Sequence, residues 1–454
     1  MLKNYLEKYK NRVALVNSHD EIKVTYKTLS ENINFLDKFI EEKSINLLLV
    51  SNNISSIIIY LAFLNSKKKC VTIILDETFN SEYIKNVINN YKPNCIYYPK
   101  YSKIFQNFEG KTFFNEYMFY KTNYKNFYFN SINKILLTTS GTTGSSKFVR
   151  LSKINLKENA KSIIKSIKIK KDHVAMTMMP MGYSFGLSII NTHLMTGAKI
   201  VINKKSILDR EFWNYFKKFE VNSLSGVPEF FYYLKKLNLN KFNLNQLVYF
   251  SQAGGSLDLN TKNYISNISK KLNIKFYSMY GQTEASPRIS CFDVTKFPKK
   301  IESAGKPIQG VRVYKLNKEK MGELLVKGKN ICLGYSESIK DLKYGDVNKG
   351  TIKTGDVGYI DKDRFIYIKG RLKRIVKLFG FRINLDEIET FLKEKKIKSK
   401  CLNRDNKLFI KYKGEISAIK IKNLLKLKFQ INSNFIDVKK SGKIVKDLNL
   451  KMRF

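Results

Sequence analysis

The sequence predicts an α/β fold with a large N-terminal domain of layered parallel sheets flanked by helices, a β-rich subdomain and a small α+β C-terminal domain. Three observations predict it. In the first half of the chain, short β-rich runs alternate with segments of helical period, which is typical of parallel sheets covered by helices. After about Gly310 the pattern becomes mostly β. After Gly370 it changes again, to strands mixed with amphipathic helices.

The expected strands of the large domain are runs rich in β-branched, aromatic and leucine residues. They are INLLLV (45–50), CVTIIL (70–75), NCIYY (94–98), KILLTT (134–139), HVAMTM (173–178), AKIVIN (198–203), QLVYF (246–250) and IKFYSMY (274–280). Segments of helical period lie between them. In LKENAKSIIKSI (156–167), for example, one helix face carries Leu156, Ala160, Ile163, Ile164 and Ile167.

The later elements suggest a domain boundary at 369–371. The β-rich stretch contains VRVYKL (311–316), GELLVKG (322–328) and RFIYIKG (364–370). The tail contains a helix in 384–394, strands in 400–404 and 407–413, and a helix in 416–429. About eighty residues suffice for a small domain. We therefore expect one domain over 1–370, with its β-rich subdomain at about 310–370, and a second over 371–454.

Composition argues against several classes of protein. The first ten residues, MLKNYLEKYK, lack the apolar run of a secretory signal. The apolar stretch 45–64 is interrupted by SNN and SS, so it predicts a strand and a helix and not a membrane span. The five cysteines are scattered with no CxxC pair, which argues against a disulfide framework or zinc site and favours a reducing, cytoplasmic location.

The net charge of +45 has two interpretations. It could serve a polyanionic partner such as nucleic acid, an anionic membrane or an acidic protein. It could also follow from a composition rich in Lys, Asn and Ile, as an AT-rich genome produces. Because no compact basic block stands out, we favour the second interpretation and expect no nucleic acid partner. The charge still favours acidic partners as a class.

The stretch TTSGTTGSSK (138–147) predicts a phosphate-binding loop. Glycine lets backbone amides approach a phosphate, and hydroxyls and lysine add donors and charge. The loop follows the apolar run KILL and precedes a helical pattern. It is not a Walker A loop, because Lys147 follows Ser146 and not glycine. A polar turn with no ligand is the structural alternative.

Seven further segments resemble, in order, those of the acyl-adenylate-forming (AMP-binding) superfamily, which holds acyl-CoA synthetases, luciferases and peptide-synthetase adenylation domains. They are AGGSL (253–257), YGQTEAS (280–286), SAGKPIQGV (303–311), GELLVKG (322–328), TGDVGYID (354–361), GRLKRIVKLFGFRINLDEIE (370–389) and SGKIV (441–445). Each is weak to moderate alone, but together they span most of the chain.

The resemblance implies roles for individual residues. Lys443 would bridge the ribose, the α-phosphate and the substrate carboxylate; Thr283 would contact the α-phosphate. Glu284 would hold Mg²⁺, because a hard cation prefers a carboxylate beside phosphate oxygens. The other ATP- or AMP-binding residues implied are Thr139, Ser140, Gly141, Thr142, Thr143, Gly144, Lys147, Gly254, Gly255, Tyr280, Gly281, Asp356 and Arg371. Among these, Tyr280 would stack on adenine, and Asp356 and Arg371 would contact the ribose.

The resemblance also implies an acyl pocket at Tyr183, Ser184 and Gly254, and a mobile C-terminal domain. Lys373 would be the hinge about which that domain turns between two half-reactions, and Gly380 would face the thiol acceptor. The chain departs from the family pattern at Ser146 and Phe148, where proline and glycine are usual. The flank of Lys443 also lacks the common proline.

The resemblance implies ATP- and Mg²⁺-dependent activation of a small carboxylic acid, then acyl transfer to the thiol of CoA or of an acidic phosphopantetheinyl carrier protein. Family members that activate amino acids commonly carry an aspartate where Ser184 stands, so we expect an acid without a free α-amino group. An amino-acid adenylating enzyme that loads a carrier protein is the alternative.

Two functions of other classes are less favoured. Gly182 to Gly186 match the G-x-S-x-G pattern of an α/β-hydrolase, with Ser184 as nucleophile. His193 is the one histidine after it, nine residues on, so a positioned base is missing. A nucleic-acid-binding module would leave the phosphate loop, Glu284, Asp356 and Lys443 without a role.

Overall fold

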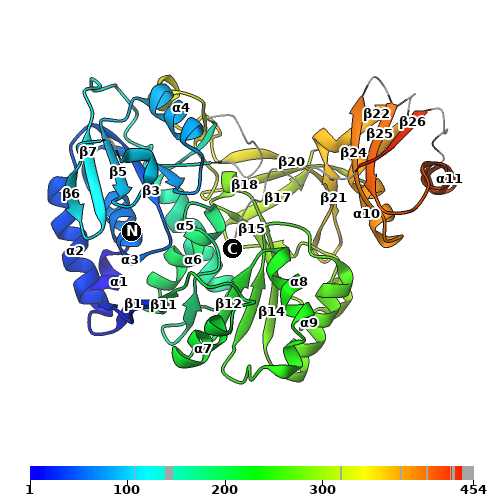
Figure 1. The fold of residues 1–454 in the computed structure, drawn as a ribbon, viewed down its shortest axis with the longest axis horizontal. Coiled ribbons are helices and arrows are strands. Elements are labelled where there is room, and N and C mark those ends of the chain that lie inside the picture. The colour runs from blue at the N-terminus through cyan, green and yellow to red at the C-terminus, as the bar shows by residue number, and fades with distance from the viewer. Residues whose placement is uncertain are drawn as a thin grey trace. The chain divides into compact units, whose positions relative to one another are not determined.

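The structure is a computed structural model of the 454-residue chain. It describes residues 1–106, 108–138, 147–316, 320–378, 381–404, 407–429, 431 and 435–441. The chain divides into two compact units (Figure 1). The first comprises Met1–Arg312 and Val326–Ile352, and the second comprises Val313–Leu325 and the described part of 353–453. The predicted division at residue 370 into a domain and a lid remains a prediction.

In the described part of the first unit, one sheet has eight strands. Its order is β19 (Gly334–Ser336), β9 (Phe148–Leu151), β8 (Ile135–Thr138), β4 (Cys70–Asp76), β3 (Ser44–Val50), β5 (Cys95–Pro99), β7 (Tyr117–Lys121) and β6 (Lys111–Phe114). The four central strands β8, β4, β3 and β5 are parallel. They are buried along almost their whole length, which explains why they consist of unbroken apolar runs.

A second sheet of the same unit has nine described strands. Its order is β16 (Lys306–Pro307), β15 (Arg288–Asp293), β14 (Lys275–Gly281), β13 (Tyr249–Gln252), β12 (Ser223–Gly226), β10 (Val174–Met176), β11 (Lys199–Ile202), β1 (Val13–Asn17) and β2 (Lys23–Thr25). The six strands from β14 to β1 are parallel, and antiparallel strands complete both edges.

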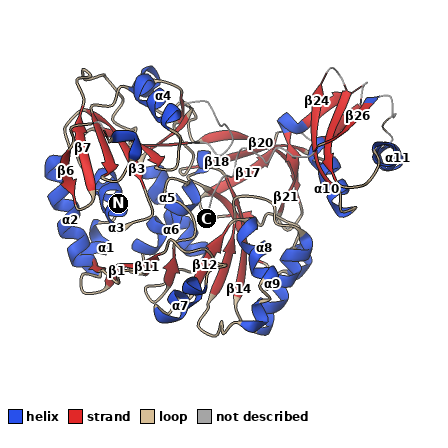
Figure 2. Ribbon diagram, in the orientation of Figure 1, coloured by secondary structure: helices blue, strands red, loops and turns tan. Residues whose placement is uncertain are grey.

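Helices follow most parallel strands, as the alternation in the sequence predicts. In this unit they are α1 (Lys3–Lys8), α2 (Tyr26–Phe39), α3 (Ile54–Asn65), α4 (Ser81–Tyr91), α5 (Lys153–Ile167), α6 (Ser184–Leu194), α7 (Arg210–Lys218), α8 (Pro228–Lys236) and α9 (Leu259–Lys271). Short 3-10 turns are η1 (Lys103–Phe105), η2 (Leu239–Lys241), η3 (Thr283–Ala285), η4 (Pro298–Lys300) and η5 (Ile339–Lys343). Figure 2 shows α8 and α9 beside β14, which α9 contacts.

One apolar core connects the two sheets of the first unit. It takes side chains from β3 and β8 of one sheet, from β1 and β11 of the other, and from helices α2, α3 and α6. Helix α3 is buried on all sides, and its sequence ISSIIIYLAFLN is accordingly apolar around its whole circumference. The Asn53 side chain caps its first turn by accepting from the amide of Ser56 at 2.8 Å.

The second unit is built from smaller elements. A four-stranded sheet, most of which lies in this unit, is ordered β17 (Val311–Lys315), β18 (Gly322–Gly328), β20 (Thr351–Ile360) and β21 (Ile366–Arg371). Next come η6 (Leu372–Arg374), the hairpin β22 (Ile375–Leu378) and β23 (Phe381–Asn384), and α10 (Leu385–Glu394). The last elements are β24 (Lys398–Arg404), β25 (Lys407–Lys413), α11 (Ala418–Phe429) and β26 (Ile436–Lys440). The last three strands form a sheet whose apolar face packs with α10 and α11.

The observed architecture confirms the predicted α/β fold class, and it corrects one local prediction. The phosphate loop was expected between a strand and a helix. A short strand, β9, intervenes before α5 because Phe148–Leu151 is fully buried and pairs antiparallel with both β8 and β19. The described residues after the loop therefore lead into a strand and not directly into a helix. Among the described residues, no helix is long and apolar enough to cross a membrane.

Candidate active site

The candidate site of the first unit lies at the carboxyl edge of the parallel part of the nine-stranded sheet. Tyr183 lies in the connection after β10, Gly254 follows β13, and Tyr280 and Gly281 end β14. Carboxyl ends of parallel strands meet at one edge, which is where open α/β sheets bind their ligands. The strand order thus brings together residues that lie about a hundred positions apart in the sequence.

The predicted acyl-pocket residues Tyr183 and Gly254 are in close proximity. A Cβ added to Gly254 would lie 2.8 Å from the phenol oxygen of Tyr183 and 3.0 Å from Cγ1 of Val227. Gly254 also has a φ of +82°, a conformation that side chains disfavour. Burial raises the pKa of Tyr183, so its phenol stays protonated and can donate a hydrogen bond. Gly255 likewise lies close to a neighbour, Cγ of Pro228.

Ser184 and Thr283 form a second contact between predicted site residues. Their hydroxyl oxygens are 3.1 Å apart, and both residues are buried. Ser184 is the first residue of α6, and Thr283 is the first of η3, directly after β14. The structure therefore places the expected α-phosphate contact, Thr283, next to the expected acyl-pocket serine.

Glu284, the expected Mg²⁺ ligand, is held by a residue that the sequence analysis missed. The phenol of Tyr335 donates to Oε1 of Glu284 at 2.8 Å. Burial and the Glu284 carboxylate raise the pKa of Tyr335. The ammonium of Lys147, the last loop residue, lies 4.1 Å from the centroid of the Tyr335 ring and 3.7 Å from a carboxylate oxygen of Glu337. Tyr335 thus connects the end of the loop with the expected metal ligand.

Two other predicted ATP-site residues lie at the end of β14. Tyr280 is half-buried there and pairs in register with Ser290 of β15. A Cβ at Gly281 would overlap the carbonyl oxygen of Pro287, so close approach of β14 and β15 by itself requires this glycine. The remaining loop residues, Thr139, Ser140, Gly141, Thr142, Thr143 and Gly144, lie outside the described residues.

In the second unit, the two predicted ribose contacts form an ion pair. Asp356 of β20 pairs in register with Arg371 of β21, and Nε of Arg371 donates to Oδ1 of Asp356 at 3.1 Å. The Asp356 side chain is 4% exposed and that of Arg371 is 63% exposed. The hydroxyl of Thr354 accepts from the Asp356 amide at 3.1 Å, which fixes the turn before the carboxylate.

The structure describes little of the predicted hinge and acceptor residues. Lys373 lies in η6, directly after the β21 strand, and its side chain is not described. Gly380 and Lys443 lie outside the described residues. Arg374, which the sequence analysis did not single out, donates to Asp386 at 2.7 Å, to Glu389 at 2.6 Å and to the carbonyl of Cys401 at 2.9 Å. It ties the segment after Lys373 to α10 and β24.

The geometry disfavours the hydrolase alternative. Ser184 Oγ is engaged with Thr283. His193 lies at the far end of the same helix, where Nδ1 donates to the carbonyl of Ile189 at 2.9 Å and Nε2 accepts from the phenol of Tyr249 at 3.2 Å. Neither side chain hydrogen-bonds the other. Burial lowers the pKa of His193 to about 4. These contacts are those of a structural histidine and not of a general base.

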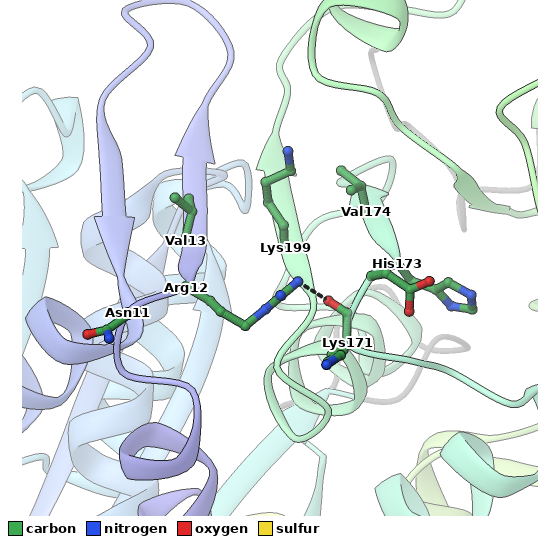
Figure 3. A pocket seen from close by; sticks show the side chains of 8 residues that line it. Asn11, Arg12, Val13, Lys171, His173, Val174 and Lys199 are labelled. Atoms are coloured by element: carbon green, nitrogen blue, oxygen red, sulfur yellow. Dashed lines mark hydrogen bonds between the residues drawn. The ribbon is translucent and has the colours of Figure 1, made fainter.

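A hollow of about 370 Å³ lies elsewhere in the first unit (Figure 3). Its lining includes Arg12, Lys171, His173 and Lys199. It lies at the amino ends of β1, β10 and β11, and the Arg12 guanidinium donates across it to the carbonyl of Lys171 at 2.6 Å. The hollow contains none of the predicted site residues, because these gather at the carboxyl ends of the strands.

Comparison with known proteins agrees with this arrangement. The sequence profile of the family described as "AMP-binding enzyme" matches residues 134–336. The chain is 31% identical over 271 residues to a probable 4-coumarate–CoA ligase of Dictyostelium discoideum, a match covering 57% of this chain and 48% of that protein. It is 28% identical over 273 residues to luciferin 4-monooxygenase of Luciola mingrelica, covering 57% and 48%. The match spans about half the length of these curated relatives.

Solved structures share the fold. The O-succinylbenzoate coenzyme A synthetase of Bacillus subtilis, solved in complex with ATP and magnesium ion, superposes with a TM-score of 0.74 at 17% identity. The match covers 96% of this chain and 95% of that one. The family profile over residues 134–336 and the fold therefore both agree with the ordered motifs of the sequence, and in both respects the chain is similar to AMP-binding enzymes.

Proposed function

We propose that the chain is an AMP-forming acid–thiol ligase. It would join a carboxylic acid without a free α-amino group to AMP, with release of pyrophosphate, and then pass the acyl group to a thiol. The observation that carries the proposal is the pair of contacts at the end of β14. Thr283 lies beside Ser184, and Glu284 is oriented by Tyr335. Both pairs occur where the ordered motifs of the family predict phosphate and metal chemistry.

The residues present fit a magnesium ion bound together with ATP. Glu284 is half-buried, and its carboxylate is oriented by the Tyr335 phenol, as outer partners orient metal ligands. Among the described residues, no cluster of three or more His, Cys, Asp or Glu side chains could hold a metal by protein ligands alone. Glu284 with phosphate oxygens is the donor set that Mg²⁺ prefers. The ion would neutralise phosphate charge when bound.

The first half-reaction brings two anions together, so charge compensation and alignment dominate its catalysis. The substrate carboxylate attacks the α-phosphorus of ATP, and the bond to pyrophosphate breaks. We propose that Thr283 contacts the α-phosphate and that Lys443 bridges it to the carboxylate. The loop 139–144 and Lys147 would hold the β- and γ-phosphates. Tyr280 would stack on adenine, flanked by Gly255 and Gly281.

The second unit would bind the ribose. A buried carboxylate is a strong acceptor for two neighbouring hydroxyls. Asp356 provides such a carboxylate, and Arg371, its partner on the neighbouring strand, orients this carboxylate. The side chain of Arg371 is long and mostly exposed, so its guanidinium would be able to move and make a second contact with the ribose. Rotation of the C-terminal domain about Lys373 would then move Lys443 out of the site. It would bring in the face around Gly380, where the thiol would enter.

Two features favour an acid that lacks an ammonium group. Ser184 stands where amino-acid-activating relatives carry an aspartate. The charged side chain that acts most strongly on the Tyr183 phenol is also a buried cation, Arg288, ahead of the Glu229 carboxylate. An ammonium group bound there would face this buried like charge, whereas the Glu229 carboxylate that could offset it is exposed. Loading of an amino acid onto a carrier protein is therefore the less favoured candidate.

The acceptor would be CoA or a phosphopantetheinyl carrier protein. The relative in Dictyostelium is described as a CoA ligase, which favours CoA. The net charge of +45 would accelerate the encounter with an acidic carrier protein at low salt. We also propose a reducing compartment such as the cytoplasm. All five cysteines are free thiols, and four of them are buried.

Acid-dependent pyrophosphate release tests the function. The chain is incubated with ATP, Mg²⁺, hydroxylamine and pooled carboxylic acids, and AMP, pyrophosphate and hydroxamates are measured. We expect AMP and pyrophosphate in equal amounts, and a large loss in Lys443→Ala. Lys440→Ala, an exposed strand lysine three residues earlier, is the matched control and should keep full activity. Release of ADP in place of AMP would contradict the mechanism.

A further inference from the structure

Arg288 is the buried cation of the candidate site. It is the first residue of β15, and it is 2% exposed. Its backbone is fixed on both sides: its amide donates to the side chain of Asn159 at 3.2 Å, and its carbonyl accepts from Asn159 at 2.9 Å and from Asn330 at 3.0 Å. The strand therefore holds the Arg288 side chain in a defined position.

The surroundings of this guanidinium are apolar and aromatic. Its Cζ lies 4.7 Å from the centroid of the Phe185 ring, and Phe185 directly follows the acyl-pocket residues Tyr183 and Ser184. Phe185 belongs to an apolar cluster with Val227 and Ala253, against which Tyr183 packs. The Arg288 side chain therefore lies beside the residues predicted to surround the acyl group.

The guanidinium has fewer partners than its burial demands. Its Nε is buried and has no hydrogen-bond partner in the part of the chain that the structure describes. Within the described residues, no carboxylate forms an ion pair with Arg288. A buried charge is normally paired and hydrogen-bonded, and the face of one aromatic ring replaces only part of the lost hydration.

Arg150 shows how this fold satisfies a structural arginine. It is also almost wholly buried, at 1% exposure. Its guanidinium donates to the side chain of Asn133 and to four main-chain carbonyls, those of Leu333, Tyr335, Tyr344 and Gly345. Arg150 needs no further partner, whereas the Nε donor of Arg288 is left without one by the described residues.

Arg288 remains a cation at neutral pH. Burial lowers its pKa to about 10, and the neighbouring Cys291 and Tyr183 oppose that effect. Burial also raises the pKa of Cys291 to about 12, so the thiol is neutral and provides no counter-charge. The guanidinium is therefore charged in an apolar site, where no carboxylate among the described residues pairs with it.

We propose that Arg288 binds a second carboxylate, at the far end of the acid substrate, so that the chain activates dicarboxylic acids. This inference rests on the proposed acid-activating function and specifies its substrate class. The apolar middle of the acid would pack against Tyr183 and Phe185, and its distal carboxylate would bind the guanidinium. Arginine suits this role because its planar fork matches a carboxylate in two parallel hydrogen bonds.

The test compares each diacid with its own monomethyl ester. Succinate, glutarate, adipate, pimelate and isophthalate are assayed by pyrophosphate release, and each ester removes the distal charge while keeping the length. We expect the wild type to prefer at least one diacid over its ester by roughly 100-fold in kcat/KM, because a buried cation is left unpaired by the ester. Equal or better use of the esters by the wild type would overturn the proposal without any variant.

Variants at position 288 locate the effect. In Arg288→Met, kcat/KM for the preferred diacid should fall by roughly 100-fold, and kcat/KM for the ester should be at least as high as in the wild type. Arg288→Lys should be intermediate, because an ammonium is a single point charge. Arg312→Met, at an exposed strand arginine, should behave as the wild type. Equal losses for diacid and ester in both Met and Lys variants would mean that Arg288 acts on the reacting carboxylate or on folding, and would overturn the proposal.

Binding separates this inference from the proposed function. Isothermal titration of the same diacids and esters into the wild-type chain and Arg288→Lys needs no turnover. If no acid releases pyrophosphate, the ligase function fails. Tighter binding of a diacid than of its ester, weakened by the lysine, would still support the Arg288 site. If acids with neutral tails alone bind and are activated, the ligase function stands and the Arg288 proposal falls.

Discussion

The phenol of Tyr335 donates a 2.8 Å hydrogen bond to Oε1 of Glu284, across a separation of 51 residues. Tyr335 lies in β19, the edge strand of the eight-stranded sheet, where it pairs with Val149 of β9. Glu284 lies in the turn after β14, and these two positions bring the side chains together. One tyrosine thereby orients the carboxylate and presents its ring face to the Lys147 ammonium. The positions of a phosphate-loop lysine and a metal ligand depend on the same side chain.

Tyr335→Phe should lower the affinity for Mg²⁺ while leaving the loop residue Lys147 in place. The phenylalanine keeps the ring under Lys147 but removes the donor to Glu284. Loss of such an outer partner typically lowers metal affinity by roughly 10- to 100-fold. We expect the Mg²⁺ concentration for half-maximal pyrophosphate release to rise by about tenfold. The exposed Tyr344→Phe is the control, and an unchanged Mg²⁺ dependence in Tyr335→Phe would contradict the assignment.

Asp356→Asn should impair ATP binding more than Arg371→Ala does. Asp356 is buried and, as an anion, accepts hydrogen bonds about twice as strong as those of an amide. Arg371 is mostly exposed, and exposed ion pairs contribute little to stability. We expect the KM for ATP to rise by roughly 10- to 100-fold in Asp356→Asn and by less than tenfold in Arg371→Ala, with similar melting temperatures. A larger effect of the arginine variant would reverse the assigned order.

Much of the fold could be predicted from sequence because its central strands carry unbroken apolar runs. The strand and helix expected in 45–64 are β3 and α3. The tail elements also occur where amphipathic periodicity predicts them, as α10 and α11 show. The carboxyl ends of parallel strands share one edge, which agrees with the proximity of Tyr183 and Gly254 that the family resemblance implied. These features depend on local pattern, which a single sequence contains.

Features that depend on long-range pairing could not be predicted. The run FVRL is too short to be distinguished from a loop, and it becomes β9 only because β8 and β19 flank it. Nothing in its residue type separates Tyr335 from the other tyrosines, of which the chain has 27 in all. Arg150 and Arg288 are both buried arginines, but one meets main-chain carbonyls and the other an aromatic ring. That difference is tertiary.

Gly254→Ala should alter the choice of acid, and Gly310→Ala should not. Both glycines have similar positive φ values, +82° and +78°, so both variants carry a backbone cost of about 1–2 kcal/mol. The new Cβ at 254 meets Tyr183 and Val227, whereas the one at 310 has nothing within 4 Å. We expect similar shifts in the urea-unfolding midpoint. The kcat/KM for longer or bulkier acids should fall in Gly254→Ala alone, and equal selectivity of the two variants would exclude Gly254 from the acyl pocket.

His193 should make the first unit less stable as the pH falls from about 6.5 to 4. Burial lowers its pKa to about 4, with the nearby basic His173 adding to the effect and the Ile189 carbonyl opposing it. The ordinary histidine pKa is about 6.5, so in this interval the unfolded chain takes up a proton that the folded chain does not. The free energy of unfolding should therefore decrease by up to about 3 kcal/mol between these pH values, beyond the change due to other groups. Urea unfolding at a series of pH values measures this decrease in the free energy of unfolding.

His193→Gln should flatten this part of the plot of unfolding free energy against pH, since glutamine does not titrate. The exposed His19→Gln should leave its slope unchanged. A slope that survives in His193→Gln would assign the pH dependence to other groups and would contradict the buried, neutral state of this imidazole.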